Sequence, residues 1–190
     1  MFSLNVPLAP AVDRLAADLH PKLEGLDTVR ERRTLVCKRF GVADVAGSDG
    51  ADGGGDDREA TEPPPRAAAL DRLRGRLSRP LGRTAPFEVA VTGVDVFDAP
   101  AAGSAPVVYL VVESEGLVRL HERLCDAFGA VEGIEGDDYV PHVTLARGGN
   151  PEPGAVASLV DAAFDPVRWR VHALDVWDPA FREVAATIDL

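Results

Sequence analysis

The sequence has little lysine, little cysteine and no long apolar run. Lys22 and Lys38 are the only lysines, and Cys37 and Cys125 the only cysteines, among 190 residues. Cysteines without metal-ligand spacing predict small buried thiols rather than a disulfide or a reactive nucleophile. With no stretch of eighteen apolar residues, the chain has no candidate transmembrane helix. The first residues lack the basic region of a secretory signal, so we expect a soluble cytoplasmic protein.

Acidic residues dominate the charge of the chain. Asp and Glu number 31 against 20 Lys and Arg, which gives a formal net charge of −11. Abundant carboxylates with scarce lysine suit a cytoplasm of very high salt, where repulsion is screened within roughly 3 Å at 1 M. We therefore expect a salt-loving microbial source. An acidic total argues against a broad nucleic-acid-binding surface, but it leaves room for one small basic pocket.

Hydrophobic periodicity predicts an α+β protein. The expected strands are 2–8, 34–40, 87–97, 106–114, 139–148, 169–178 and 182–190, and the expected helices are 11–24, 66–79, 116–128 and 153–164. The Gly- and Asp-rich stretch at 46–62 is interpreted as a flexible acidic loop. Each half of the chain contains a strand, a helix and a strand with a Thr-Leu pair. This weak internal repeat suggests one bilobal domain over 1–190, with a shared cleft.

The segment YVPHVTLARG at 139–148 carries the clearest chemical motif. Side chains two residues apart in a strand share a face, so His142 and Thr144 project together. An imidazole can take or give a proton, and a threonine hydroxyl can donate to a phosphate oxygen. Arg147 adds a cation at the end of the strand. A single His-x-Thr pair arises by chance too readily to identify catalysis by itself.

The motif PHVTLAR, the order of the elements and the earlier Thr34-Leu35 strand resemble the two-histidine phosphoesterase superfamily, in particular its 2′-5′ RNA ligase-like and cyclic phosphodiesterase branch. The resemblance covers most of the chain. It implies two lobes, each an antiparallel sheet with flanking helices, around a central cleft. In that family each lobe supplies a His-x-Thr pair, and the two histidines act as base and acid without a metal.

What the resemblance implies for this chain is a site for 2′,3′-cyclic or 2′-5′ phosphodiesters. The expected partner is an RNA end or a small nucleotide, and no cofactor and no metal are expected. His142 takes the place of a proton-transfer residue. Thr144 and Thr34 take the places of the threonines that hold phosphate oxygens.

The first motif departs from the family pattern. Aligning 32–35 with 142–145 puts Arg32 where the first histidine should stand, and a one-residue slip would exchange it with Arg33. Arginine cannot shuttle protons near neutrality, but its forked donors hold phosphate well. The stretch 30–40 contains five basic residues and one acidic residue. We therefore predict phosphate contacts from four cations: Arg32, Arg33, Lys38 and Arg147.

Two aromatic residues, Tyr139 and Phe87, are candidates for stacking on a nucleobase, although packing is their commoner role. The other histidines fit structural positions in the predicted elements; they are His20, His121 and His172. The Asp-rich stretch 52–57 lacks the spacing of a calcium loop and is interpreted as part of the solvated acidic loop.

Three functions stay open at this stage. The leading hypothesis is a phosphoesterase with weak turnover, because one positioned acid or base contributes roughly 10²–10⁴-fold. The second is a non-catalytic protein that binds a nucleotide or RNA end in a degenerate site. The third is a protein that keeps only the fold and fills its cleft with Arg–carboxylate pairs.

Overall fold

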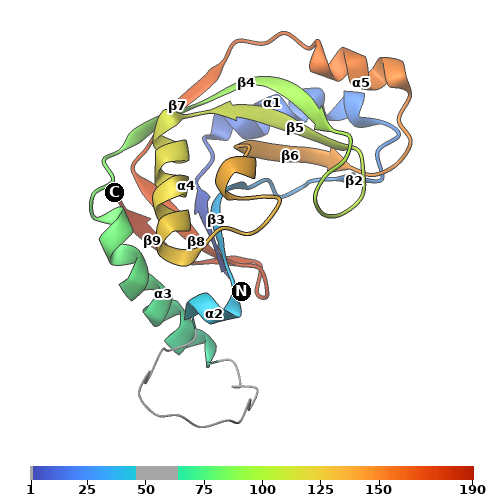
Figure 1. Cartoon of the computed structure of the whole chain (residues 1–190). Coiled ribbons are helices and arrows are strands. Elements are labelled where there is room, and N and C mark those ends of the chain that lie inside the picture. The colour runs from blue at the N-terminus through green and yellow to red at the C-terminus, as the bar shows by residue number, and fades with distance from the viewer. Residues whose placement is uncertain (1, 46–63) are drawn as a thin grey trace, which may run out of the picture.

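A curled antiparallel sheet organises the computed structural model, which describes residues 2–45 and 64–190 (Figure 1). The strands are β1 Phe2–Val6, β2 Thr28–Val29, β3 Leu35–Phe40, β4 Phe87–Phe97, β5 Val107–Glu113, β6 His142–Arg147, β7 Val167–Val171, β8 Ala173–Asp178 and β9 Glu183–Asp189. The acidic loop expected at 46–62, with its Asp-rich stretch, lies outside the described residues.

The helices are α1 Pro10–Leu19, α2 Val42–Val45, α3 Arg66–Leu81, α4 Glu115–Phe128 and α5 Pro153–Val160, with short 3₁₀ turns η1 His20–Leu23 and η2 Gly136–Asp138. The four expected helices correspond to α1 with η1, α3, α4 and α5. Within the described ranges, no helix is long and apolar enough to cross a membrane.

Two halves of the sheet meet at β3 and β6. The strand order is β7-β4-β5-β6-β3-β1-β8-β9, with β2 added beside β6. Only one residue pair, Leu35 with Val143, joins β3 to β6, whereas five pairs join β5 to β6. The halves can therefore splay apart on one face. The expected α+β fold, with two antiparallel lobes around a cleft, is confirmed.

The single strand expected over 169–178 is wrong. It divides at His172 into β7, which pairs with β4, and β8, which pairs with β1 in the other lobe. Since one residue links strands that lie far apart in the sheet order, the sheet must curl to bring them together. The alternating burial continues across His172, so no periodicity signal marks the change of lobe. The expected hairpin between β8 and β9 is present.

Helix α4 shows how local signals fix one wall of the core. The Ser114 hydroxyl accepts a hydrogen bond from Leu117 N at 3.1 Å, which caps the first turn. Gly129 ends the helix at φ +79°, a conformation that glycine adopts without steric cost. Leu117, Leu120 and Leu124 recur at helical spacing and are fully buried. Their burial packs α4 against β3 and β4 (Figure 1).

The contact between α4 and β4 generates a stability prediction. A Cβ atom at Gly116 would come within 2.4 Å of Phe87 Cβ, a distance that neither backbone tolerates. Gly116→Ala is therefore expected to lower the free energy of unfolding by about 1–3 kcal/mol, measured by urea or thermal unfolding.

Gly75→Ala is the matched control in α3, because a Cβ there meets nothing within 4 Å. It should stabilise the protein by about 0.5–1 kcal/mol through higher helix propensity. A Gly116→Ala protein as stable as the Gly75→Ala protein would contradict the close approach of α4 to β4.

Candidate functional site

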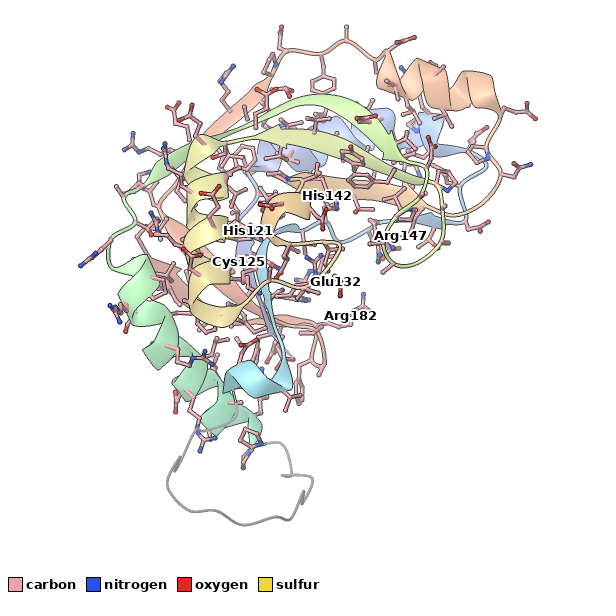
Figure 2. The ribbon with its side chains drawn as sticks, in the orientation of Figure 1. His121, Cys125, Glu132, His142, Arg147 and Arg182 are labelled. Carbon is pink, nitrogen blue, oxygen red and sulfur yellow. The ribbon has the colours of Figure 1, made fainter. Side chains whose placement is uncertain are left out.

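A cavity of about 930 Å³ opens where β3 and β6 lie side by side, on the sheet face opposite the core. Both lobes line it. The motif-strand residues that reach it are Thr34, Val36 and Arg39 from one lobe and His142, Thr144 and Arg147 from the other. The remaining wall includes Arg30, Arg32, Tyr139, Trp177, Arg182 and the small residues 99–102. Figure 2 shows His142 and Arg147 along β6, with Arg182 on the far side of the opening.

Strand β6 changes face once along its length. Its pairing with β5 skips Leu145, which is the extra residue of a β-bulge. Leu145 and the following Ala146 are both buried in the core. Arg147 therefore points into the same cavity as His142 and Thr144, although it is an odd number of residues away from them.

Strand β3 contains the same device. Its pairing with β1 skips Cys37, and Cys37 and Lys38 are both buried. Arg39 consequently lines the cavity together with Thr34 and Val36. Strict alternation would have put Lys38 in the cavity and Arg39 in the core.

Matching the two bulges superimposes one motif strand on the other. This register places Thr34 with His142, Val36 with Thr144 and Arg39 with Arg147. The sequence alignment through the Thr-Leu pairs differs from it by two residues. Arg32 belongs to a bend that precedes β3.

His142 is held as a neutral base at the centre of the cavity. Its Nδ1 lies 2.7 Å from the Val140 carbonyl, which can only accept, so Nδ1 carries the proton and Nε2 keeps its lone pair. Burial lowers the pKa of His142 below 6.5, and the charges of Arg39 and Arg147 lower it further. The Phe97 ring packs edge-on against the imidazole at 5.2 Å.

Lys38, expected at the phosphate, lies in the core instead and bonds to Glu135. Its Nζ donates to Glu135 Oε2 at 2.6 Å and to the Arg39 carbonyl at 2.7 Å, and neither side chain of the Lys38–Glu135 pair is more than 1% exposed. Glu135 also accepts from Arg39 N at 2.8 Å and from Val131 N at 3.0 Å. The pair thus ties the cavity wall that follows Val131 to the bulge that aims Arg39.

The two neighbouring arginines before β3 separate. Arg32 lines the cavity, where its guanidinium stacks over Trp177 at 4.2 Å and donates to the Arg182 carbonyl at 2.5 Å. Arg33 points away from the cavity and forms a 3.2 Å ion pair with Asp13. Of the two, only Arg32 is placed to contact a ligand in the cavity.

The two aromatic candidates also separate. Tyr139 lines the cavity but stacks on His121 at 3.7 Å, and its hydroxyl donates to the Val36 carbonyl at 2.8 Å. Burial raises the pKa of Tyr139, so its hydroxyl stays protonated. Phe87 packs on Gly116 at the α4–β4 contact, outside the cavity.

Several cavity residues escaped the sequence-based prediction. Arg39 belongs to the basic stretch, but only the bulge brings it to the cavity. Arg30 precedes β3, while Trp177 and Arg182 come from the β8–β9 hairpin, and no motif marks them. Over the described ranges, no three His, Cys, Asp or Glu side chains gather as metal ligands.

Comparison with known proteins adds a family to this geometry. The model of the 2′-5′ RNA ligase superfamily matches residues 59–180, which include β6 and leave β3 outside. The chain belongs to the 2′-5′ RNA ligase superfamily. Membership implies phosphoesterase- or ligase-like chemistry and binding of RNA or nucleotide substrates.

The crystal structure of TT0787 of Thermus thermophilus shares the fold of this superfamily member. The TM-score is 0.61 at 24% identity, over 100% of this chain and 97% of that chain. No curated protein matches the sequence. At this identity the likeness concerns the fold, and the site rests on the residues described above.

The buried Lys38–Glu135 pair can be tested directly. Lys38→Met leaves the Glu135 carboxylate buried without its cation, so we expect a loss of about 3–5 kcal/mol in the free energy of unfolding. Adding Glu135→Gln removes the isolated charge and should restore part of the loss, as measured by urea unfolding.

Arg119→Met is the control, since the Arg119–Glu115 pair is exposed on α4 and should leave the stability almost unchanged. Equal stabilities of the Lys38→Met and Arg119→Met proteins would contradict the buried pair.

Proposed function

We propose that this protein binds 2′,3′-cyclic or 2′-5′ phosphodiesters of RNA or nucleotides and cleaves them slowly without a metal, with His142 as its single proton-transfer residue. One observation carries the proposal: a neutral imidazole presents Nε2 to a cavity that arginines and threonine hydroxyls line. Arginine guanidinium and threonine hydroxyl groups are suited to phosphate oxygens.

The proposed reaction on a 2′,3′-cyclic phosphodiester uses His142 as general base. Nε2 takes a proton from a water whose oxygen forms a bond to phosphorus, while one ribose P–O bond breaks. The leaving oxygen takes its proton from water, because Thr34 occupies the position that the bulge register matches with His142. Slow turnover follows from this missing acid.

The phosphate would be held from both lobes. Arg39 reaches the cavity close enough to His142 to lower its pKa, so it is the cation that we place on the reacting phosphate. Thr144 and Thr34 would donate hydroxyl hydrogens to nonbridging oxygens, and Arg32 would add a donor from the Trp177 side. In the described part of the chain, Arg32 and Arg147 form no salt bridge, so carboxylates do not fill the site.

A non-catalytic nucleotide or RNA-end binder is the second candidate. Val36 favours it, since this side chain stands where the bulge register matches Thr144 and offers no hydroxyl to phosphate. In this case the cations bind the ligand while neither strand completes the reaction.

Hydrolysis of adenosine 2′,3′-cyclic phosphate, with binding followed in parallel by calorimetry, separates the two. His142→Ala should lower turnover roughly 100-fold or more while binding persists. Arg39→Gln should weaken binding roughly 10–100-fold, the effect of a lost charged hydrogen bond. Arg33→Gln is the matched control, because Arg33 lies beside Arg32 in sequence but outside the cavity.

Binding without turnover in every form would establish the binder, and no binding at all would refute the proposed site. Restoring a histidine tests the two alignments of the first motif. Faster turnover in Thr34→His than in Arg32→His supports the bulge register, and the reverse order supports the Thr-Leu alignment.

The state of His142 predicts the pH dependence. Because its pKa in the fold lies below 6.5, we expect turnover to be constant near pH 7 and to fall only below pH 6.5. The same depression means that the unfolded chain binds the proton more tightly, so stability also declines as the pH falls from 6.5 through the folded pKa.

An NMR titration of the imidazole and a pH–rate profile measure these effects. His172→Gln, which alters an exposed side chain away from the cavity, should leave the profile unchanged. An acidic limb with an apparent pKa above 6.5 in the free protein would argue against a neutral His142.

A further inference from the structure

Arg147 has donors that the protein does not satisfy. Its Nε is buried without a hydrogen-bond partner, and its Nη1 reaches the Ala102 carbonyl only at 3.4 Å. Gly103 lies directly against the guanidinium, where any Cβ would come within 2.4 Å of Nη1. A buried polar atom without a partner is rare and costs about 1–3 kcal/mol, so a missing ligand explains it well.

Arg30 stands beside Arg147. Strand β2 pairs Thr28 with Arg147, and Arg30 N donates to the Leu145 carbonyl at 2.7 Å, which fixes this segment along β6. Both arginines line the cavity, and the charge of Arg30 adds to burial in lowering the pKa of Arg147. Neither forms a salt bridge within the described residues, so two close cations lack an anion.

This pair lies apart from the reaction centre. Arg147 follows Thr144 by three residues, so the Cα atoms are separated by roughly 10 Å at most, from the rise of a strand. Arg39 lies beyond the opposite end of the His142–Thr144 pair. One phosphoryl group at His142 and a second one at Arg147 can therefore occupy the cavity together.

The wall over Arg147 leaves room for such a group. The connection between β4 and β5 contributes Ala99, Pro100, Ala101 and Ala102 to the cavity, and none of these side chains is large or charged. A ligand there meets two guanidinium groups on one side and small apolar residues on the other. That combination suits a phosphoryl group attached to a nucleoside better than a free polyanion.

We infer that Arg30 and Arg147 form a second anion subsite, which takes the 5′-phosphoryl group of a nucleotide whose 2′,3′-phosphodiester lies at His142. The inference rests on the proposed function and narrows its substrate class. The preferred ligand carries two phosphoryl groups on one nucleoside, either as a 5′-phosphorylated cyclic nucleotide or as the end of an RNA strand.

Two stable product-side probes test the subsite by calorimetry at one fixed salt concentration: adenosine 2′-monophosphate and adenosine 2′,5′-bisphosphate. The bisphosphate should bind roughly tenfold or more tightly, as a second charge-assisted contact implies. In Arg30→Met and Arg147→Met the ratio of the two dissociation constants should fall toward one. In Arg33→Met, whose side chain lies outside the cavity, the ratio should persist.

The outcomes separate the two levels of the account. A wild-type ratio near one, or a ratio that survives Arg30→Met, overturns the second subsite while monophosphate binding upholds the proposed function. If neither probe binds, both fall. A dinucleotide with a terminal 2′-phosphate distinguishes the sources: a gain equal to that of the bisphosphate assigns an RNA end, and a smaller gain assigns a terminal 5′-phosphate.

Discussion

Side chains of a strand alternate between two faces, and one extra residue reverses that alternation for the rest of the strand. Both motif strands of this protein use that reversal. The bulges at Cys37 and Leu145 bring Arg39 and Arg147 to the cavity, one at each end of the His142–Thr144 pair. The cavity is positive because of where two residues are skipped, in a chain whose formal charge is −11.

The single buried lysine follows from the same geometry. Once the bulge turns Lys38 toward the core, its ammonium needs a buried partner, and Glu135 supplies it at 2.6 Å. Glu135 in turn binds the backbone of Arg39 and of Val131. A charge that could have bound substrate instead holds the wall of the site. The acidic exterior repels long nucleic acids, whereas the cavity offers a local positive potential to a small anion or a chain end.

Sequence patterns predicted much of the fold and part of the site. Helical spacing located α4 within two residues of its bounds, and the His-x-Thr pattern brought His142 and Thr144 to one cavity face. Lys38 and Arg39 were exchanged between faces, because a bulge depends on pairing with β1 and leaves no signal in β3 itself. Similarly, the alternation over 169–178 runs through His172, and only the partner strands show that the chain changes lobe there.

The first motif shows where family resemblance and geometry diverge. The Thr-Leu pairs align Arg32 with His142, while the bulges align Thr34 with it. Strand pairing constrains side-chain direction more directly than two matching letters, so we favour the bulge register for the chemistry of this site.

The central claim is that the bulged strands aim Arg39, His142 and Arg147 into one anion-binding cavity. A crystal structure with adenosine 2′-monophosphate tests it most directly. The account predicts the phosphate between His142 Nε2 and the Arg39 guanidinium, with Lys38 still buried on Glu135. A phosphate bound by Lys38 with Arg39 in the core, or a ligand bound outside the cavity, would contradict it.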